Sequence, residues 1–418
     1  MMAADPKQQA TEERLAALTL PEGGGWLGAA RKDALGRLEA VRLPGRRDEY
    51  WRYTNPAPLV QAAPALDVPD QVEDPFEGVD ALVVTIDGDN IEIPGELPAG
   101  LEIGTLADAA RADIHWAKEL YGHREAAGSR PVSRPLAMLN SAFATNGLVI
   151  RATGKVAMPI HVRTGGGTDP ILHHLVKVET GASVTVLESG IAGARSNIVT
   201  EIDVADDGTF HHIRVDGPTR ARHGNTHLFA RLGAESTFKS FTLSAHGELT
   251  RNEAVVELTG DDAVSHIAGA AFGQGDFHHD DTVFVIHDAE NCESRQVYKK
   301  VLRDGAVGVF QGKILVKEGA QKTDGYQISQ SLLLDDDSVF LAKPELEIYA
   351  DDVACSHGST TGAIDETALF YLRSRGVPER AATDLLVLSF LAEALEEIED
   401  ETLRANISGR LADWLSRD

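Results

Sequence analysis

The chain has 418 residues, 43% of them hydrophobic and 25% charged, with a formal net charge of −26. This length exceeds what one hydrophobic core usually serves, so we expect two or three structural units. The acidic charge argues against a nucleic-acid-binding protein, which needs clustered Lys and Arg, and against a protein that rests on an anionic membrane surface.

The sequence also lacks the patterns of an exported or membrane-spanning protein. No apolar run approaches the roughly 20 residues of a membrane span, and the acidic, polar start is unlike a signal peptide. The two cysteines, Cys292 and Cys355, form neither a CxxC motif nor a disulfide framework. We therefore expect a cytoplasmic protein with both thiols reduced.

Residues 1–145 are predicted to form an N-terminal region of mixed structure. It contains several helices, a Pro- and Ala-rich connector and two short strands. The helices are expected at 11–40 (interrupted by Pro21–Gly25), 105–121 and 134–144, the connector at 56–74, and the strands at 81–86 and 91–93.

From residue 146 to 363 the sequence becomes a train of short strands, rich in Val, Ile, Thr and Phe and bounded by Gly, Asp or Asn. Because no helices separate them, a doubly wound α/β sheet is excluded. The train is too long for one ordinary sandwich, so we predict a β-solenoid or a large barrel, although no repeat of fixed period is visible. Examples of these strands are expected at 148–150, 156–162, 171–178, 183–188, 198–204, 210–215, 226–232, 237–243, 254–258 and 282–287.

Residues 364–418 are predicted to be helical. A helix over Asp365–Arg375 ends at Gly376, and Pro378 suits the first turn of the next helix. That helix, over 381–398, carries a wide apolar stripe. The apolar residues of a last helix are Leu403, Ile407, Leu411, Trp414 and Leu415.

The strongest candidate site lies where the strands give way to helices. An apolar-alternating strand over 346–353 leads to Cys355 and His357. Side chains at i and i+2 of a strand project from one face, so this thiol and this imidazole can reach the same place. Two ligands are too few to complete a zinc or cluster site. The pair is therefore either half of a metal site or a buried thiol beside a turn histidine.

The other motifs give no support for a functional site. GVFQGKIL, which starts at Gly308, has the wrong spacing for a phosphate-binding loop and lacks the Ser or Thr after its lysine, so we expect no bound nucleotide. The histidine doublets at 173–174, 211–212 and 278–279 should point to opposite faces of their strands, so no doublet can chelate one ion. Cys292 has no preceding cation close enough to lower its thiol pKa.

Two stretches resemble a known family. GVFQGKILVKEGAQKTDGYQISQSLLL (308–334) and KPELEIYADDVACSHGSTTGAIDETALFYLRSRG (343–376) are similar to the SufB/SufD family of iron–sulfur cluster assembly proteins. RRDEYWRYTN (46–55) resembles an early segment of the SufD branch. The resemblance implies a mostly β fold with helical ends, in which a right-handed parallel β-helix over 146–363 is flanked by the regions 1–145 and 364–418.

The same resemblance implies a function. The chain would be a non-catalytic scaffold subunit that pairs with SufB and docks the SufC ATPase, and it would form a homodimer when isolated. A histidine at the position of His357 is implicated in nascent cluster formation at the SufB–SufD interface, so the cluster would be transient and shared, with Cys355 as a second candidate ligand. The family's C-terminal helices dock SufC. The residues here of the types enriched at interface hot spots are Phe370, Tyr371, Arg373 and Arg375.

Two alternatives stay open. The chain could be the SufB-type subunit that carries the cluster-building cysteines, although two cysteines and the tryptophan segment favour the SufD branch. It could also be a β-helix carbohydrate-active enzyme that uses Asp351 and Asp352, but four Trp residues and the absence of a signal peptide speak against it. Ile328, Ser329 and Ser331 stand where the family usually has asparagines, so no asparagine ladder is implied there.

Overall fold

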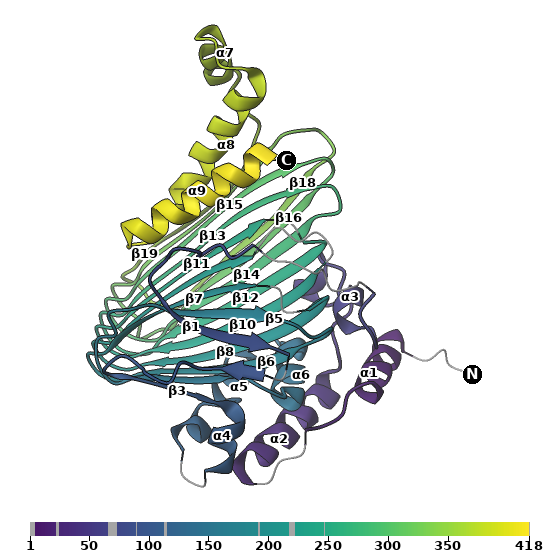
Figure 1. Cartoon of the computed structure of the whole chain (residues 1–418), viewed down its shortest axis with the longest axis vertical. Helices are drawn as coiled ribbons and strands as arrows, with labels where there is room; N and C mark the ends of the chain where they lie inside the picture. Colours follow the sequence, from purple (N-terminus) through teal and green to yellow (C-terminus); the bar gives the residue numbers. More distant parts are fainter. Residues whose placement is uncertain are drawn as a thin grey trace.

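Two long, mostly parallel β-sheets lie face to face and form a solenoid, with helices at both ends of the chain (Figure 1). This computed structural model describes residues 5–21, 25–65, 73–88, 90–112, 115–190, 193–216, 222–245 and 247–417. We call the ten-stranded sheet, ordered β19-β17-β15-β13-β11-β9-β7-β5-β1-β2, sheet A. Sheet B has nine strands, ordered β18-β16-β14-β12-β10-β8-β6-β4-β3. The predicted fold class is confirmed.

The N-terminal region combines short helices with three strands. Its elements are α1 (Pro6–Ala16), α2 (Gly25–Val41), η1 (Glu49–Trp51), α3 (Ala57–Val60), β1 (Leu82–Asp87), β2 (Asn90–Glu92), β3 (Leu101–Thr105), α4 (Leu106–Arg111), η2 (Trp116–Glu119), α5 (His123–Gly128) and α6 (Pro135–Phe143).

The solenoid strands then alternate between the sheets, and three helices follow. The strands are β4 (Leu148–Ala152), β5 (Ile160–Gly165), β6 (Ile171–Val178), β7 (Ser183–Gly190), β8 (Arg195–Val204), β9 (Thr209–Asp216), β10 (His223–Leu232), β11 (Thr237–Ala245), β12 (Leu249–Leu258), β13 (Val264–Gln274), β14 (His278–His287), β15 (Glu293–Arg303), β16 (Val307–Val316), β17 (Asp324–Leu333), β18 (Val339–Ile348) and β19 (Ala354–Gly362). The helices are α7 (Glu366–Ser374), α8 (Glu379–Leu395) and α9 (Glu401–Arg417).

One turn of the solenoid changes in length along the chain, which explains why no fixed repeat is visible. Val149 on β4 pairs with Leu175 on β6, 26 residues later, whereas Val307 on β16 pairs with Val339 on β18, 32 residues later. The inward and outward alternation survives this drift because each added residue lies in a loop.

The tight corners between a sheet B strand and the next sheet A strand share a backbone conformation, but the residue type at the shared position varies. Five successive corners place a non-glycine residue in the left-handed region, with φ between 55° and 62°. These residues are Asp207, Glu235, Asp262, Asn291 and Lys322. Their amides donate to the neighbouring corner, as from Asp207 to the carbonyl of Ala234. Stacking thus supports a conformation that side chains other than Asn and Asp adopt only at a cost.

The core lies between the sheets, and helices cover their outer faces. The C-terminal hairpin of α8 and α9 packs Leu391, Leu411 and Trp414 on sheet A. Sheet B is covered by α5, by α6 and by Tyr50 of η1. Figure 1 shows α7 reaching beyond the sheets at the end of the molecule opposite α2 and α4.

Several sequence-based boundaries were wrong. The first helix begins at Pro6 rather than residue 11, because the Asp5 carboxylate caps it, and residues 22–24 lie outside the described part. The helix expected over 105–121 is two short helices after β3, which was missed, and residues 113–114 are not described. The connector at 56–74 contains α3, and its residues 66–72 are likewise not described.

The strand bounds also shifted. β5 begins at Ile160 rather than 156, and β12 begins at Leu249 rather than 254. The first half of β12 was missed because Arg251 and Glu253 read as exposed residues, yet both are buried in ion pairs against the N-terminal helices. The helices predicted over 134–144, 365–375 and 381–398 are confirmed as α6, α7 and α8 with small shifts at their ends.

The ends of the solenoid differ. At the N-terminal end, antiparallel β2 and β3 close sheets A and B. At the other end, β18 and β19 each pair with one strand only among the described residues, so their outer edges are free. In the described part of the chain, no helix is long and apolar enough to cross a membrane.

Candidate functional site

The candidate site lies at the open end, in the turn formed by β18 and β19. The expected strand over 346–353 is not one strand, because β18 ends at Ile348 and the chain turns through a tight corner before β19 begins at Ala354. Cys355 and His357 both lie on β19, two residues apart, so they share one face as predicted.

Cys355 points into the solenoid. Its thiol lies 3.1 Å from the position that a Cβ would take on Gly325, the paired residue on β17, so a larger residue at that position would crowd the thiol. Burial raises the pKa of the Cys355 thiol, and the nearby Asp324 carboxylate raises it further. The thiol is therefore protonated at neutral pH, and a metal ion would have to displace that proton.

His357 lies on the same inward face but is exposed, because no further turn covers it. Its in-register neighbour on β17 is Gln327, which in turn pairs with Gln296 on β15. The amide of Gln327 donates to the Gln296 carbonyl oxygen at 2.8 Å. A ladder of two buried glutamines thus runs beneath the exposed imidazole.

The two free strand edges differ in their hydrogen-bonding capacity. The amides of Val339 and Tyr349 point from β18 toward the neighbouring strand β16, so by alternation position 344 faces the free edge. That position is Pro344, which has no amide proton to give, as is usual for a proline at an edge. On β19 the amide of Ala354 points toward β17, so the amides of Cys355 and His357 face the free edge without interruption.

A complete metal site is not present in this chain alone. Within the ranges that the structure describes, no group of three or more His, Cys, Asp or Glu side chains is arranged to hold a metal ion. Cys355 and His357 therefore offer two donors at an open end, and further ligands would have to come from elsewhere.

The second predicted surface is α7, which buries none of its residues. Phe370 is 73% exposed and Tyr371 is 56% exposed. Arg375 lies 4.9 Å above the Tyr371 ring, and Arg373 forms a 3.1 Å ion pair with Glu379 at the start of α8. The Asp365 carboxylate accepts from Thr367 and Ala368 and so fixes the start of the helix. An ordered helix thus presents aromatic side chains to solvent.

The tryptophan-centred segment serves as a brace. Trp51 lies under the Arg251 guanidinium, 4.0 Å from its ring centroid. The Thr54 hydroxyl donates to Asp280, and Gln311 donates to the Tyr50 carbonyl at 3.1 Å. The segment therefore packs on the outer face of sheet B rather than forming a site of its own.

The histidine doublets divide between the two faces as predicted. His211 points out toward Glu399 at 3.4 Å, whereas His212 points in and bonds the Ser240 hydroxyl at 2.9 Å. The other two doublets behave alike, with His173 and His278 outside and His174 and His279 inside.

Charges inside the solenoid are paired. Burial alone would raise the pKa of Glu188, but His212 and Arg214 lower it to about 2. Lys300 donates to Asp281 at 2.7 Å and to His279 at 2.8 Å, and burial lowers the pKa of His279 to about 4. These groups support packing, since each one has its partner beside it.

Cys292 is part of a corner rather than a reactive site. It is fully buried, and its thiol donates to the Gly260 carbonyl at 3.3 Å. Burial raises the pKa of the Cys292 thiol to about 11. The carboxylates proposed for a carbohydrate-active enzyme also lie in a corner, where Asp352 pairs with Lys322.

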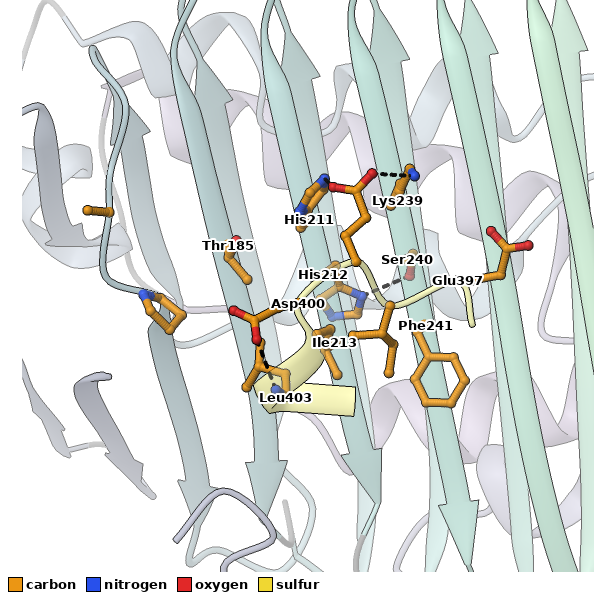
Figure 2. Close-up of a pocket in the computed structure, with 14 residues that line it drawn as sticks. Thr185, His211, His212, Ile213, Lys239, Ser240, Phe241, Glu397, Asp400 and Leu403 are labelled. Carbon is orange, nitrogen blue, oxygen red and sulfur yellow. Dashed lines mark hydrogen bonds and ion pairs between the residues drawn. The ribbon is translucent and has the colours of Figure 1, made fainter. Parts of the chain in front are cut away.

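One pocket lies away from the open end. Figure 2 shows it between the outer face of sheet A and the loop that joins α8 to α9. The cavity has a volume of about 80 Å³. Glu399 in this loop bonds Lys239 at 2.5 Å, and Glu397 bonds His266 at 3.0 Å. Because its charged groups are paired across the cleft, the pocket anchors the helical hairpin to the sheet.

Sequence reasoning missed three residues of the open end: Gln296, Gln327 and Gly312. A Cβ on Gly312 would come within 2.2 Å of the Gln327 amide nitrogen, so the glycine makes room for that side chain. In the sequence these positions are marked only by the two glycines of GVFQGKIL, whose pattern resembles that of a phosphate-binding loop. Its glycines instead accommodate interior side chains.

Comparison with known proteins agrees with this architecture. A family model described as "SUF system FeS cluster assembly, SufBD core domain" matches residues 162–390. An iron–sulfur cluster assembly protein SufD of Escherichia coli is 29% identical over 407 residues, which cover 91% of each chain. An iron–sulfur cluster assembly SufBD family protein of Synechocystis is 28% identical over 430 residues, 92% of this chain and 90% of its own. SufD of Bacillus subtilis is 28% identical over 257 residues, 59% of this chain and 58% of its own. The chain thus belongs to the SufBD family of the SUF system, and this membership gives it a role in iron–sulfur cluster assembly.

Proposed function

We propose that this chain is the SufD-type scaffold subunit of a cytoplasmic SUF complex, and that it pairs with SufB through the open end of its solenoid. It is non-catalytic and binds no nucleotide. The similarity to two proteins named SufD supports the SufD-type role. The open end carries the proposal, because it combines a free strand edge with two metal-binding side chains.

The pairing rests on the uninterrupted edge of β19. Exposed strand edges readily add another strand, and the free amides of Cys355 and His357 offer donors to it. Pro344 interrupts the neighbouring edge of β18 and so disfavours continuous addition there. The pairing edge is therefore β19 rather than the strand expected over 346–353.

The cluster is a transient cargo that forms between the two subunits. His357 supplies a nitrogen ligand, Cys355 a second candidate ligand, and the partner subunit supplies the remainder. An exposed histidine at the end of a solenoid is available to a neighbouring chain, and neutral imidazole suits iron.

The helix α7 docks the ATPase SufC. Its exposed Phe370 and Tyr371, with Arg373 and Arg375 beside them, are of the types that dominate interface energetics. The absence of buried residues on α7 means that its stability depends on its cap and on α8.

Co-expression with SufB and SufC, followed by anaerobic reconstitution with ferrous iron and sulfide, tests this function. The wild-type complex should gain the visible absorption of an iron–sulfur cluster. The His357→Ala complex should assemble from the same subunits but hold little iron and sulfide, while Cys355→Ser should have a smaller effect. Ser356→Ala, on the opposite face of β19, is the matched control. Wild-type cluster content in the His357→Ala complex would rule out the ligand role.

A further inference from the structure

The glutamine ladder beneath His357 is an unusual feature for the interior of a solenoid. Gln296 and Gln327 are both fully buried, and their neighbours in the same inward row nearer the N-terminus are Ile267 and Ser240. Burying an amide is favourable only when its polar atoms are bonded. The polar atoms of these two buried side-chain amides therefore need hydrogen-bond partners.

The side chain of Gln327 is held in one place. Its amide nitrogen donates to the Gln296 carbonyl oxygen at 2.8 Å, which directs it toward the preceding turn. The missing side chain of Gly312 on the opposite sheet leaves the space that the amide occupies. The position of the Gln327 carboxamide is thus fixed from both sides of the solenoid.

The second polar atom of this carboxamide is its oxygen, which accepts no hydrogen bond from any residue that the structure describes. Among the described residues, the Gln327 Oε1 atom is buried and has no hydrogen-bond partner. The next residue in the row is His357, which pairs in register with Gln327. In-register side chains of parallel strands stack about 4.8 Å apart, as in glutamine ladders, so rotation of the exposed His357 side chain can bring its ring to this oxygen.

We propose that Gln327 is a positioning residue for His357, whose ring N–H donates to the buried carboxamide oxygen. The orientation of the ring does not depend on the proposed function; only the role of the imidazole as an iron ligand rests on it. An amide oxygen accepts but cannot donate, so the contacting ring nitrogen must carry the proton. The other ring nitrogen then keeps its lone pair and faces the open end, where it can bind iron. Metal-binding histidines are commonly oriented by such a bond on their second nitrogen.

Nitrogen-15 NMR of the isolated full-length chain with labelled histidine rings tests the proposal without any cluster. The His357 signals are assigned by their loss in His357→Ala, and spectra are recorded at a pH at which the imidazoles are neutral. Wild type should show a single tautomer for His357. Gln327→Leu should show both tautomers, and Gln327→Glu, which keeps an acceptor oxygen, should restore one. Gln330→Leu, on the outward face of β17, should match wild type.

The outcomes separate the two proposals. A mixture of tautomers in wild type, or an unchanged single tautomer in Gln327→Leu, would overturn the positioning role. If Gln327→Leu does not fold, Gln327→Met removes the amide at nearly constant length, and the wild-type spectrum remains decisive. In the reconstituted complex, Gln327→Leu should lower the affinity for ferrous iron by about tenfold or more. Normal cluster content in His357→Ala would instead end the ligand role, whatever the tautomer.

Discussion

The Tyr50 hydroxyl donates a 2.6 Å hydrogen bond to the Glu345 carboxylate, which joins two residues 295 positions apart. The Tyr50 ring also packs edge-on against Phe284, with centroids 5.1 Å apart, and lies 4.2 Å from the Lys343 ammonium. The N-terminal segment thereby holds β18, the last strand of sheet B. The open end owes its order in part to a segment from the start of the chain.

Tyr50→Phe should therefore destabilise the last turn of the solenoid. Removing the hydroxyl takes away one of the two partners of the partly buried Glu345 carboxylate and leaves the Lys343 ammonium at 3.5 Å. The lost hydrogen bond costs about 1 kcal/mol. Urea denaturation measures the loss, and hydrogen exchange should show faster exchange of the β18 amides. Tyr349→Phe is the matched control, because the Tyr349 hydroxyl bonds Glu347 on the exposed surface. Equal effects of both changes would show that the brace contributes nothing specific.

The sequence predicted many of the strands, because their alternation depends only on neighbouring residues. It did not predict how they stack, because one turn takes 26 residues near β4 and 32 near β18. The left-handed corner position is occupied by Asp207, Glu235 and Lys322 alike, so it leaves no motif. A varying period with varying corner residues hides the repeat from any fixed-length search.

For the candidate site as well, the sequence predicted the relationships within one strand but not the contacts between turns. Cys355 and His357 share a face because they lie two residues apart on one strand, a local relationship that the sequence shows. Gln327 and Gly312 join them through pairing across turns and across the interior, and their positions follow only from the stacking register. Glycines that accommodate an interior side chain look in the sequence like those of a phosphate loop.

The exposed aromatic face of α7 leads to a prediction about SufC. Changing both Phe370 and Arg373 to Ala should abolish co-purification with SufC and leave the thermal unfolding of the chain unchanged, because α7 buries none of its residues. A pull-down with tagged SufC measures this. Val83→Ala is the control, since Val83 is an exposed apolar residue on distant β1. Undiminished capture of the double variant would place the docking surface elsewhere.

The free edge of β19 leads to a prediction about self-association. Without SufB, the chain should form a two-fold dimer through this edge. Thr361→Pro should raise the dimer dissociation constant by about tenfold or more, because it removes one free amide from each copy. Thr361→Ala keeps that amide and should behave as wild type. Light scattering across a dilution series measures the mass, and a monomer at every concentration of the wild-type chain would contradict the dimer.

The buried histidine His287 leads to a prediction about pH. Its ring bonds the Ser294 hydroxyl at 2.8 Å inside the solenoid, and burial lowers its pKa from 6.5 to about 4. Because this folded-state pKa lies below the value of the unfolded chain, the unfolded chain takes up the proton first. The stability that comes from the neutral ring is therefore present above about pH 6.5 and is lost as the pH falls toward about 4.

Over that window the loss amounts to about 3 kcal/mol in the free energy of unfolding. His287→Gln keeps a polar group in place but does not titrate, so its stability relative to wild type should rise by this amount between neutral pH and about pH 4. Urea denaturation of both proteins at a series of pH values measures the difference. A stability difference that stays constant across the series would show that His287 keeps an ordinary pKa in the folded protein, and that burial does not hold its ring neutral.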